Sequence, residues 1–298
     1  APAVPRRGDY RTPMQGRGPI EGGLIVLSGP LKFRLILGAV LAGGFVAAAL
    51  FGPGLAPEDP SAIDLARAFE LPGMGSVLGR DELGRDLLSR LLHGARLAFL
   101  VSVPGVGLGA AFGILAGLWA GYRGGTIERV IMRCVDVLLS FPGFLLALAA
   151  ATAMGPGTKN LIVAIGFFSF PDFARVARAK ARSLRQEEYV AAAHTFGAGS
   201  PYILRRHILT NAWSALAALC SLRMAQAIAA ASGLSFLGLG PPLPVADWGT
   251  MIDLGREYMW IAPRLVLLPM AAVALSSLGF YLIGDALEGT GPGRSGSA

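Results

Sequence analysis

Six long apolar runs constrain this 298-residue chain more than any other feature of its sequence. Most of them approach or exceed the roughly 20 residues that a helix needs to cross a bilayer, although Pro171 and Asp172 interrupt a shorter fourth run. The runs cover residues 35–55, 97–122, 137–154, 161–174, 208–234 and 265–284. Because only helices and closed barrels satisfy their backbone hydrogen bonds in lipid, we predict an all-α membrane bundle of six transmembrane helices.

The composition agrees with a chain whose surface faces lipid. Only 15% of the residues are charged, against about 25% in soluble domains, and the mean hydropathy is +0.57. A net charge of +7 would indicate nucleic-acid binding in a soluble protein, but here the cationic residues cluster at the ends of the apolar runs. We therefore assign them to membrane orientation and lipid headgroups, and we expect no nucleic-acid partner.

Lysine and arginine are unevenly divided between the segments that join the runs. With the N-terminus inside, the inner segments hold 17 of these residues and the outer segments hold 8. The positive-inside rule therefore predicts that both termini are cytoplasmic. We expect residues 1–30 to form a flexible basic tail and residues 289–298 a C-terminal tail.

Residues 81–96, which precede the second run, alternate between apolar and polar residues with the period of a helix. Leucines fall on one face of this stretch, and charged residues and a serine fall on the other. The pattern predicts a helix that either lies along the membrane interface or packs on the bundle as an ordinary amphipathic helix. We assign residues 31–94 to the first transmembrane helix and an outer loop with this interfacial helix, and residues 95–288 to a transmembrane domain.

The sequence contains none of the patterns that are typical of enzymes. It has no Walker phosphate loop, no nucleophile elbow, and no metal-ligand spacing among its three histidines and two cysteines. A polytopic membrane enzyme would also need a catalytic cluster at membrane depth, and the runs show no such cluster. We therefore expect no catalytic residue, no metal site and no cofactor bound by this chain.

Charges inside the apolar runs are the most informative candidates for function, because burying a charge in a membrane is costly. Arg223 lies about midway along the fifth run and must face water, a carboxylate or backbone carbonyls. Asp136, near the inner end of the third run, is a candidate partner. Two interpretations stay open: Arg223 borders a hydrated path, or Arg223 takes part in a structural ion pair between helices.

The segment ARVARAKARSLRQEEYVAAAHTFGAGSPYILRRHILTNA, between the fourth and fifth runs, resembles the cytoplasmic loop with the EAA motif of ABC importer permeases. The positions that match that pattern are Ala192, Ala193, Gly197 and Leu209. The positions that depart from it are Ala191, where Glu is usual, Thr210, where Pro is usual, and His207, where Ile is usual.

Three further segments narrow the resemblance to the permeases of peptide and nickel importers. They are LGRDELGRDLLSRLLHGAR, GYRGGTIERVIMRCVDVLLSFPGFLLALA and SFLGLGPPLPVADWGTMI. The resemblance covers about residues 30–290 and is close to the shorter permease of the pair. It implies a type I importer permease fold in a bacterial inner membrane. It also implies a path for dipeptides or oligopeptides delivered by a soluble binding protein, or alternatively for nickel or another small solute.

The same resemblance implies a set of partners and a contact site. The partners are a second permease subunit in a heterodimer, two ATP-binding subunits that use ATP and Mg, an extracytoplasmic substrate-binding protein, and membrane lipid. Residues 175–207 correspond to the loop that couples the permease to an ATP-binding subunit. The residues expected at this contact are Glu187, Glu188, Tyr189, Ala192, Ala193, Phe196 and Gly197. The alanines permit close approach, and the glycine permits a sharp turn between two short helices.

Overall fold

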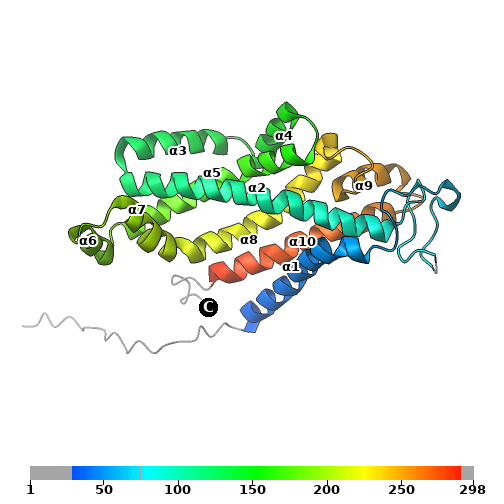
Figure 1. Cartoon of the computed structure of the whole chain (residues 1–298), viewed down its shortest axis with the longest axis horizontal. Helices are drawn as coiled ribbons and strands as arrows, with labels where there is room; N and C mark the ends of the chain where they lie inside the picture. The colour runs from blue at the N-terminus through cyan, green and yellow to red at the C-terminus, as the bar shows by residue number, and fades with distance from the viewer. Residues whose placement is uncertain (1–28, 74, 290–298) are drawn as a thin grey trace, which may run out of the picture.

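A computed structural model describes residues 29–73 and 75–289, and over these residues the chain is helical, with no strand beyond isolated bridges (Figure 1). Five helical segments in this part are long and apolar enough to cross a membrane. Their main helices are α1 (Gly29–Leu55), α2 (Leu87–Arg123), α5 (Thr158–Leu184), α8 (Leu209–Leu234) and α10 (Arg264–Gly289). The predicted tails, apart from their residues at 29, 30 and 289, lie outside the described residues.

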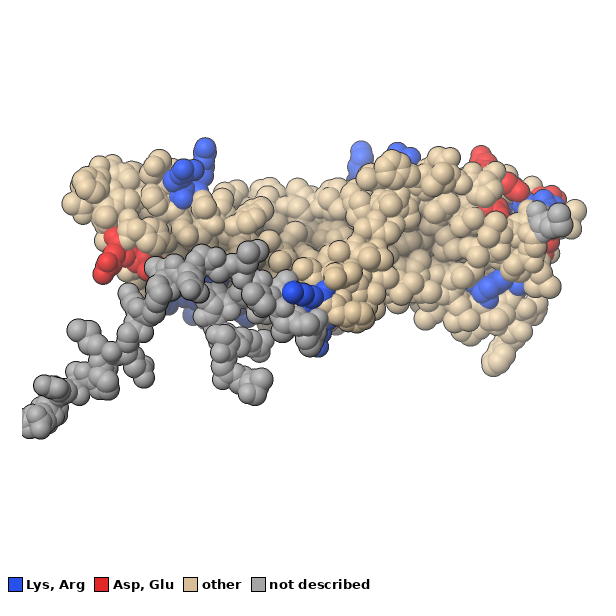
Figure 2. Space-filling view, turned by 90° about the horizontal axis from the view of Figure 1, so that it is seen from below, with Lys and Arg blue, Asp and Glu red and all other residues tan. Residues whose placement is uncertain are grey.

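Shorter elements join or extend these helices. They are α3 (Gly125–Leu139), α4 (Gly143–Met154), α6 (Glu188–Thr195), α7 (Ser200–Ile203), α9 (Trp248–Gly255), 3-10 turns at Leu65–Arg67 and Arg256–Tyr258, and π-helical segments at Leu204–Ile208 and Ser235–Leu239. Figure 1 shows α6 and α7 at one end of an elongated molecule and α9 near the other, and we call these the α6–α7 end and the α9 end. Acidic side chains gather near both ends of the face in Figure 2, as expected for a molecule that crosses a membrane lengthwise.

The sequence predicts a single transmembrane helix for the third apolar run, but the structure shows that this run is not one straight helix. It is divided between α3 and α4, which meet at an angle of 89° and give a sixth span only if they are counted together. Pro142 stands at the start of α4 with non-helical backbone angles of −54° and 126°. A proline ring disfavours the helical conformation of the residue before it, which is Phe141 here, so the chain bends at this point.

The helix predicted over residues 81–96 is wrong in its first part and is not a separate interfacial helix. Residues 81–86 form turns, and α2 begins only at Leu87 and then continues to Arg123. The Asp86 carboxylate caps α2 by accepting a hydrogen bond of 2.8 Å from the backbone N–H of Ser89. The boundary that we placed between residues 94 and 95 therefore falls inside a single long helix.

Close packing of α2 against α5 organises the bundle. From Gly105 to Gly121 every fourth residue of α2 is glycine, and a Cβ atom added to any of these five would lie 2.2–2.7 Å from an atom of α5. The contacts advance along both helices together, so α2 and α5 run in the same direction. Small residues at this spacing let two helix backbones approach closely, as is common in membranes.

The pair α1 and α10 runs antiparallel beside this core. A Cβ atom on Gly38 would lie 2.9 Å from the Gly279 carbonyl oxygen, and Arg34 forms an ion pair of 2.8 Å with Asp285. The first described residues of α1 and the last of α10 therefore lie together, and Figure 1 shows both directed toward the α6–α7 end.

Candidate coupling loop and intramembrane charges

The loop that resembles a coupling element is two short helices joined by a tight turn. Helix α6 ends at Thr195, and Gly197 follows with a φ of +81°, a left-handed conformation that favours glycine. The Gly197 N–H donates to the His194 carbonyl and the Ala198 N–H donates to the Ala193 carbonyl, each at 3.0 Å. These two bonds are those of a Schellman motif, which satisfies the last carbonyls of α6. The sharp turn predicted at Gly197 is present.

The α6–turn–α7 segment is held against the bundle by a few specific contacts. Val190 and Ile203 are buried in the main core cluster. The Tyr122 hydroxyl, at the end of α2, and His194 Nε2 form a hydrogen bond of 2.8 Å, and the two rings are parallel. Sequence reasoning missed this link between His194 and Tyr122.

Most of the seven residues expected at the coupling contact face outward. Phe196 is 89% exposed, and Tyr189 is also exposed. The other exposed members are Glu187, Glu188, Ala192 and Gly197. Ala193 is the exception, because it is half-buried and packs against the main core cluster. Burial and the nearby charge of Glu187 raise the pKa of Tyr189, so its hydroxyl stays protonated at neutral pH.

Asp136, which the sequence offered as a candidate partner, does not pair with Arg223. Arg223 Nη2 lies 2.9 Å from Asp172 Oδ1 on α5, and Asp136 instead meets Arg175 at 3.1 Å. The reason is that Pro171 does not end α5. The helix continues through that proline to Leu184. Asp172 therefore lies within this spanning helix, opposite α8.

Three ion pairs follow one another along α5. Asp172 pairs with Arg223 on α8, Arg175 pairs with Asp136 on α3, and Arg178 pairs with Glu128 on α3. The three α5 residues are three positions apart, so they lie along one side of the helix. The pairs therefore connect α5 to α8 near the middle of the span and to α3 closer to the α6–α7 end.

A cavity of about 360 Å³ lies beside the first of these ion pairs. Its walls come from the break between α3 and α4, from α5, and from α8, and they include Phe141, Asp172, Arg223 and Gln226. The cavity therefore brings charged groups together with a place where a spanning helix is interrupted.

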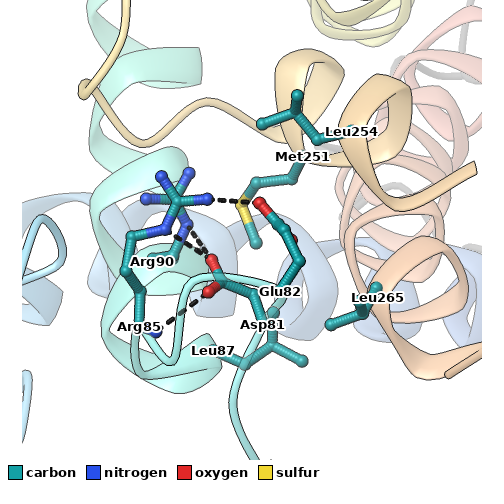
Figure 3. Close-up of a pocket in the computed structure, with 8 residues that line it drawn as sticks. All are labelled: Asp81, Glu82, Arg85, Leu87, Arg90, Met251, Leu254 and Leu265. Atoms are coloured by element: carbon teal, nitrogen blue, oxygen red, sulfur yellow. Dashed lines mark hydrogen bonds and ion pairs between the residues drawn. The ribbon is translucent and has the colours of Figure 1, made fainter. Parts of the chain in front are cut away.

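A second cluster of charges is buried at the α9 end and was not anticipated from the sequence. Figure 3 shows Arg85 and Arg90 directed toward Asp81, at 2.7 Å and 3.4 Å, while Arg85 also reaches Glu82 at 2.6 Å. The pocket beside them holds only about 10 Å³, which is enough for one water molecule. The cluster therefore ties the outer loop to the start of α2 and leaves no room for a substrate.

Neighbouring polar groups complete this outer fold. Arg80 pairs with Glu58 and Glu70, both of which come from the loop before it. Burial alone would raise the pKa of Asp86, but hydrogen bonds from Ser76 and Ser89 outweigh it and lower that pKa below its ordinary value. Within residues 29–73 and 75–289, no three His, Cys, Asp or Glu side chains are grouped so that they could hold a metal ion.

Residues 113–289 match the family model of the binding-protein-dependent transport system inner membrane component. The chain belongs to this family. Among curated proteins, the permease is 41% identical to the glutathione transport system permease protein GsiD of Pectobacterium atrosepticum, over 84% of this chain and 85% of that one. It is 39% identical to the probable D,D-dipeptide transport system permease protein DdpC of Escherichia coli, over 80% of each chain.

Among solved structures, the permease resembles an inward-facing form of the MetNI methionine ABC transporter. The TM-score is 0.51 at 16% identity, over 69% of this chain and 96% of that one. This likeness concerns the fold, and it confirms the expected all-α, type I importer permease architecture. The expected family, the ABC importer permeases of the peptide and nickel group, is also confirmed, and so is the role of a membrane-spanning transport subunit rather than an enzyme. The permease is an inner-membrane component.

Proposed function

We propose that this permease, paired with a second permease subunit, forms the path by which a dipeptide or oligopeptide crosses the inner membrane. An extracytoplasmic binding protein delivers the peptide, and two ATP-binding subunits drive the cycle with ATP and Mg. The names of the relatives, which refer to glutathione and D,D-dipeptide transport, support a peptide as the cargo. Both chain termini and the α6–α7 end lie on the cytoplasmic side in this proposal.

The observation that carries the proposal is the presentation of the α6–turn–α7 segment. Val190, Ile203 and the Tyr122–His194 hydrogen bond hold its helices against the bundle. The side chain of Phe196 is exposed on the opposite side. A nearly fully exposed phenylalanine on a rigid turn offers a partner protein a large apolar contact. Closure of the ATP-binding subunits would then move this turn, and the anchors would transmit the movement to α2 and α8.

The test uses the permease pair, the ATP-binding subunits and the binding protein together in proteoliposomes. Wild type is expected to take up a labelled dipeptide only with ATP and loaded binding protein. Phe196→Ala is expected to weaken binding of the ATP-binding subunit by about tenfold or more, as for an aromatic anchor at an interface. Phe33→Ala, which removes an exposed aromatic ring from α1, serves as the matched control.

Two results would contradict this proposal. If no peptide bound by the binding protein is taken up in an ATP-dependent way, the proposed transport of peptides is refuted. Equal co-purification of the ATP-binding subunit with Phe196→Ala and with Phe33→Ala would show that the turn is not the contact.

A further inference from the structure

Three features of the permease coincide at one place inside the bundle. The backbone is interrupted between α3 and α4, a cavity of about 360 Å³ opens beside the interruption, and an ion pair joins α5 to α8 in its wall. Non-helical backbone at membrane depth is tolerated only where protein buries it or where it lines a polar cavity, and discontinuous helices in transporters commonly border substrate sites. The cavity is therefore the strongest candidate for a place where cargo contacts this chain.

The size of the cavity suits a short peptide, because small-molecule sites commonly measure about 300–1,000 Å³. Leu139, Phe141 and Phe168 give it apolar walls, while its polar groups are the Asp172–Arg223 pair and Gln226. Gln226 lies three residues after Arg223 on α8, so both side chains fall on the same side of that helix. The lining thus combines apolar surface with a few polar groups on one wall.

The guanidinium of Arg223 has unused hydrogen-bonding capacity. Its Nη2 contacts Asp172 at 2.9 Å, yet its Nε is buried and has no hydrogen-bond partner. The Phe168 ring centroid is 5.8 Å from the guanidinium carbon and adds a cation–π contact. Arginine has five donors in a fork that matches a carboxylate, so the present single contact to Asp172 leaves room for a second carboxylate.

A comparison within α5 separates this pair from an ordinary surface ion pair. The side chains of Arg223 and Asp172 are 17% and 27% exposed, whereas those of Arg175 and Asp136 are 57% and 59% exposed. Only the first pair is part of the cavity wall. A solvent-exposed pair contributes little to stability, and a partly buried one at membrane depth carries a desolvation cost that a specific function can explain.

We propose that Arg223 binds the α-carboxylate of a peptide in transit, while Asp172 faces its ammonium group. The proposal rests on the peptide function above. A peptide with uncharged side chains and both termini free carries one positive and one negative end, so its entry adds no net charge to a cavity whose own pair is neutral. Blocking either terminus would leave one uncompensated charge among these groups, which is costly away from water. Arg223 and Asp172 would then favour peptides whose two termini are both free.

The test measures ATP-dependent uptake by the complete importer in proteoliposomes. The peptides are Ala-Ala and a C-terminal dipeptide amide that the binding protein is measured to bind, each supplied at a saturating concentration. The variant Asp172→Asn with Arg223→Gln replaces the two charged groups by neutral side chains that can still form hydrogen bonds. It is expected to lower Ala-Ala uptake about tenfold or more and to lower uptake of the amide much less, because only the former loses a charged carboxylate contact.

The controls separate this role from assembly and from the choice made by the binding protein. The binding protein is the same in every arm, so its preference cancels when each variant is divided by wild type for the same peptide. The variant Arg175→Gln with Asp136→Asn, which removes the exposed pair, is expected to leave the ratio of Ala-Ala to amide uptake unchanged. ATPase activity stimulated by loaded binding protein reports whether each variant assembles. If the neutral pair at 172 and 223 fails to assemble, Arg223→Lys keeps the charge and removes the planar fork, and it should shift the same ratio.

The outcomes are distinct. Unchanged Ala-Ala uptake in the neutral-pair variant would overturn the proposal, and so would an equal loss for Ala-Ala and the amide, which would show that the pair is only structural. Failure of wild type to import any peptide would instead refute the underlying peptide function.

Discussion

At the scale of single residues, the tightest steric constraints lie where α2 meets α5. The five glycines from Gly105 to Gly121 occupy positions where a methyl group would overlap the facing helix. Gly117 is the extreme case, because its added Cβ would lie 2.2 Å from the Ala174 carbonyl oxygen. Gly107, on the same helix, has nothing within 4 Å of such an atom. Replacing each of these two glycines by alanine therefore separates the effect of packing on stability from the effect of helix propensity.

Gly117→Ala is expected to destabilise the permease by about 1–3 kcal/mol, because α2 and α5 must move apart to admit the methyl group. Gly107→Ala, the matched control, is expected to be neutral or to stabilise by up to about 1 kcal/mol through helix propensity. Thermal unfolding of the purified complex in detergent measures both. Equal melting temperatures for the two variants would show that the α2–α5 contact tolerates separation.

Asp247, which precedes α9, gives a prediction that depends on pH. The residue is buried, and its carboxylate accepts a hydrogen bond of 3.0 Å from the Thr250 hydroxyl. Burial raises the pKa of Asp247 above its ordinary value, although hydrogen bonds from Ser235, Thr250 and Gly249 partly oppose it. The folded state therefore holds the proton more tightly than the unfolded state. This contribution to stability is complete below the unfolded pKa and is lost as pH rises through the folded pKa.

Asp247→Asn removes this titration. As the pH rises from 4 to 8, the melting temperature of wild type should therefore fall relative to that of the variant by at least about 2 °C. Asp253→Asn alters a more exposed carboxylate on α9, which pairs with Arg256 at 3.2 Å, and it serves as the control for general effects of pH. A wild-type curve parallel to that of Asp247→Asn over this range would contradict the prediction.

At the scale of elements, the turn between α6 and α7 depends on one left-handed residue. The φ of Gly197 is +81°, and a Cβ atom there would meet nothing within 4 Å. A side chain at this position would therefore strain the backbone without any steric clash with neighbours. Gly199, two residues later, has an extended conformation with a φ of −70° that any residue adopts.

Gly197→Val is expected to cost about 1–2 kcal/mol locally, because the left-handed conformation is unfavourable for a branched side chain, and to displace Phe196. ATPase activity stimulated by loaded binding protein should fall several-fold in the complete complex. Gly199→Val should stay close to wild type, since its φ suits valine. If Gly197→Val keeps full stimulation, the geometry of this turn does not matter for coupling.

At the scale of the whole molecule, the structure groups distant segments at two ends. The Gly157 N–H donates to the Leu239 carbonyl at 3.3 Å, so the α4–α5 connection lies beside the π-helical segment that follows α8, close to Gly240. Ser183 lies near the opposite end of α5, which leads into α6. A single orientation in the membrane must therefore place Gly157 and Gly240 on one side and Ser183 on the other.

Single cysteines test the orientation after Cys134 and Cys220 are both replaced by serine. Two of them replace Pro156 and Leu243, which are exposed residues close to Gly157 and Gly240, and the third replaces the exposed Ser183. We expect a membrane-impermeant thiol reagent to label Pro156→Cys and Leu243→Cys in spheroplasts, and Ser183→Cys only in inverted vesicles. This pattern follows from the excess of Lys and Arg on the proposed cytoplasmic side. The reverse pattern would place the termini and the α6–α7 end outside the cell. It would then contradict the proposed coupling of this end to an ATP-binding subunit.

The sequence by itself determined the features that depend on local chemistry. Apolar length predicted the spans, and a lone glycine after alanines predicted the Gly197 turn, because hydrophobic thickness and left-handed φ are properties of short segments. Four ordered blocks of residues indicated the family. The Asp86 cap of α2 also had a local signal, since aspartate is a favoured N-cap, but the leucine period before it extended the predicted helix too far.

Only the tertiary structure decided which distant residues meet. Arg223 pairs with Asp172 rather than Asp136 because α5 continues through Pro171 and packs in a particular register against α8. The 89° bend between α3 and α4, and the cavity that it borders, likewise depend on where neighbouring helices leave space. Apolar spans and tight turns depend on interactions within a few residues, whereas ion pairs and cavities depend on how whole helices pack, which the order of residues along one helix does not specify.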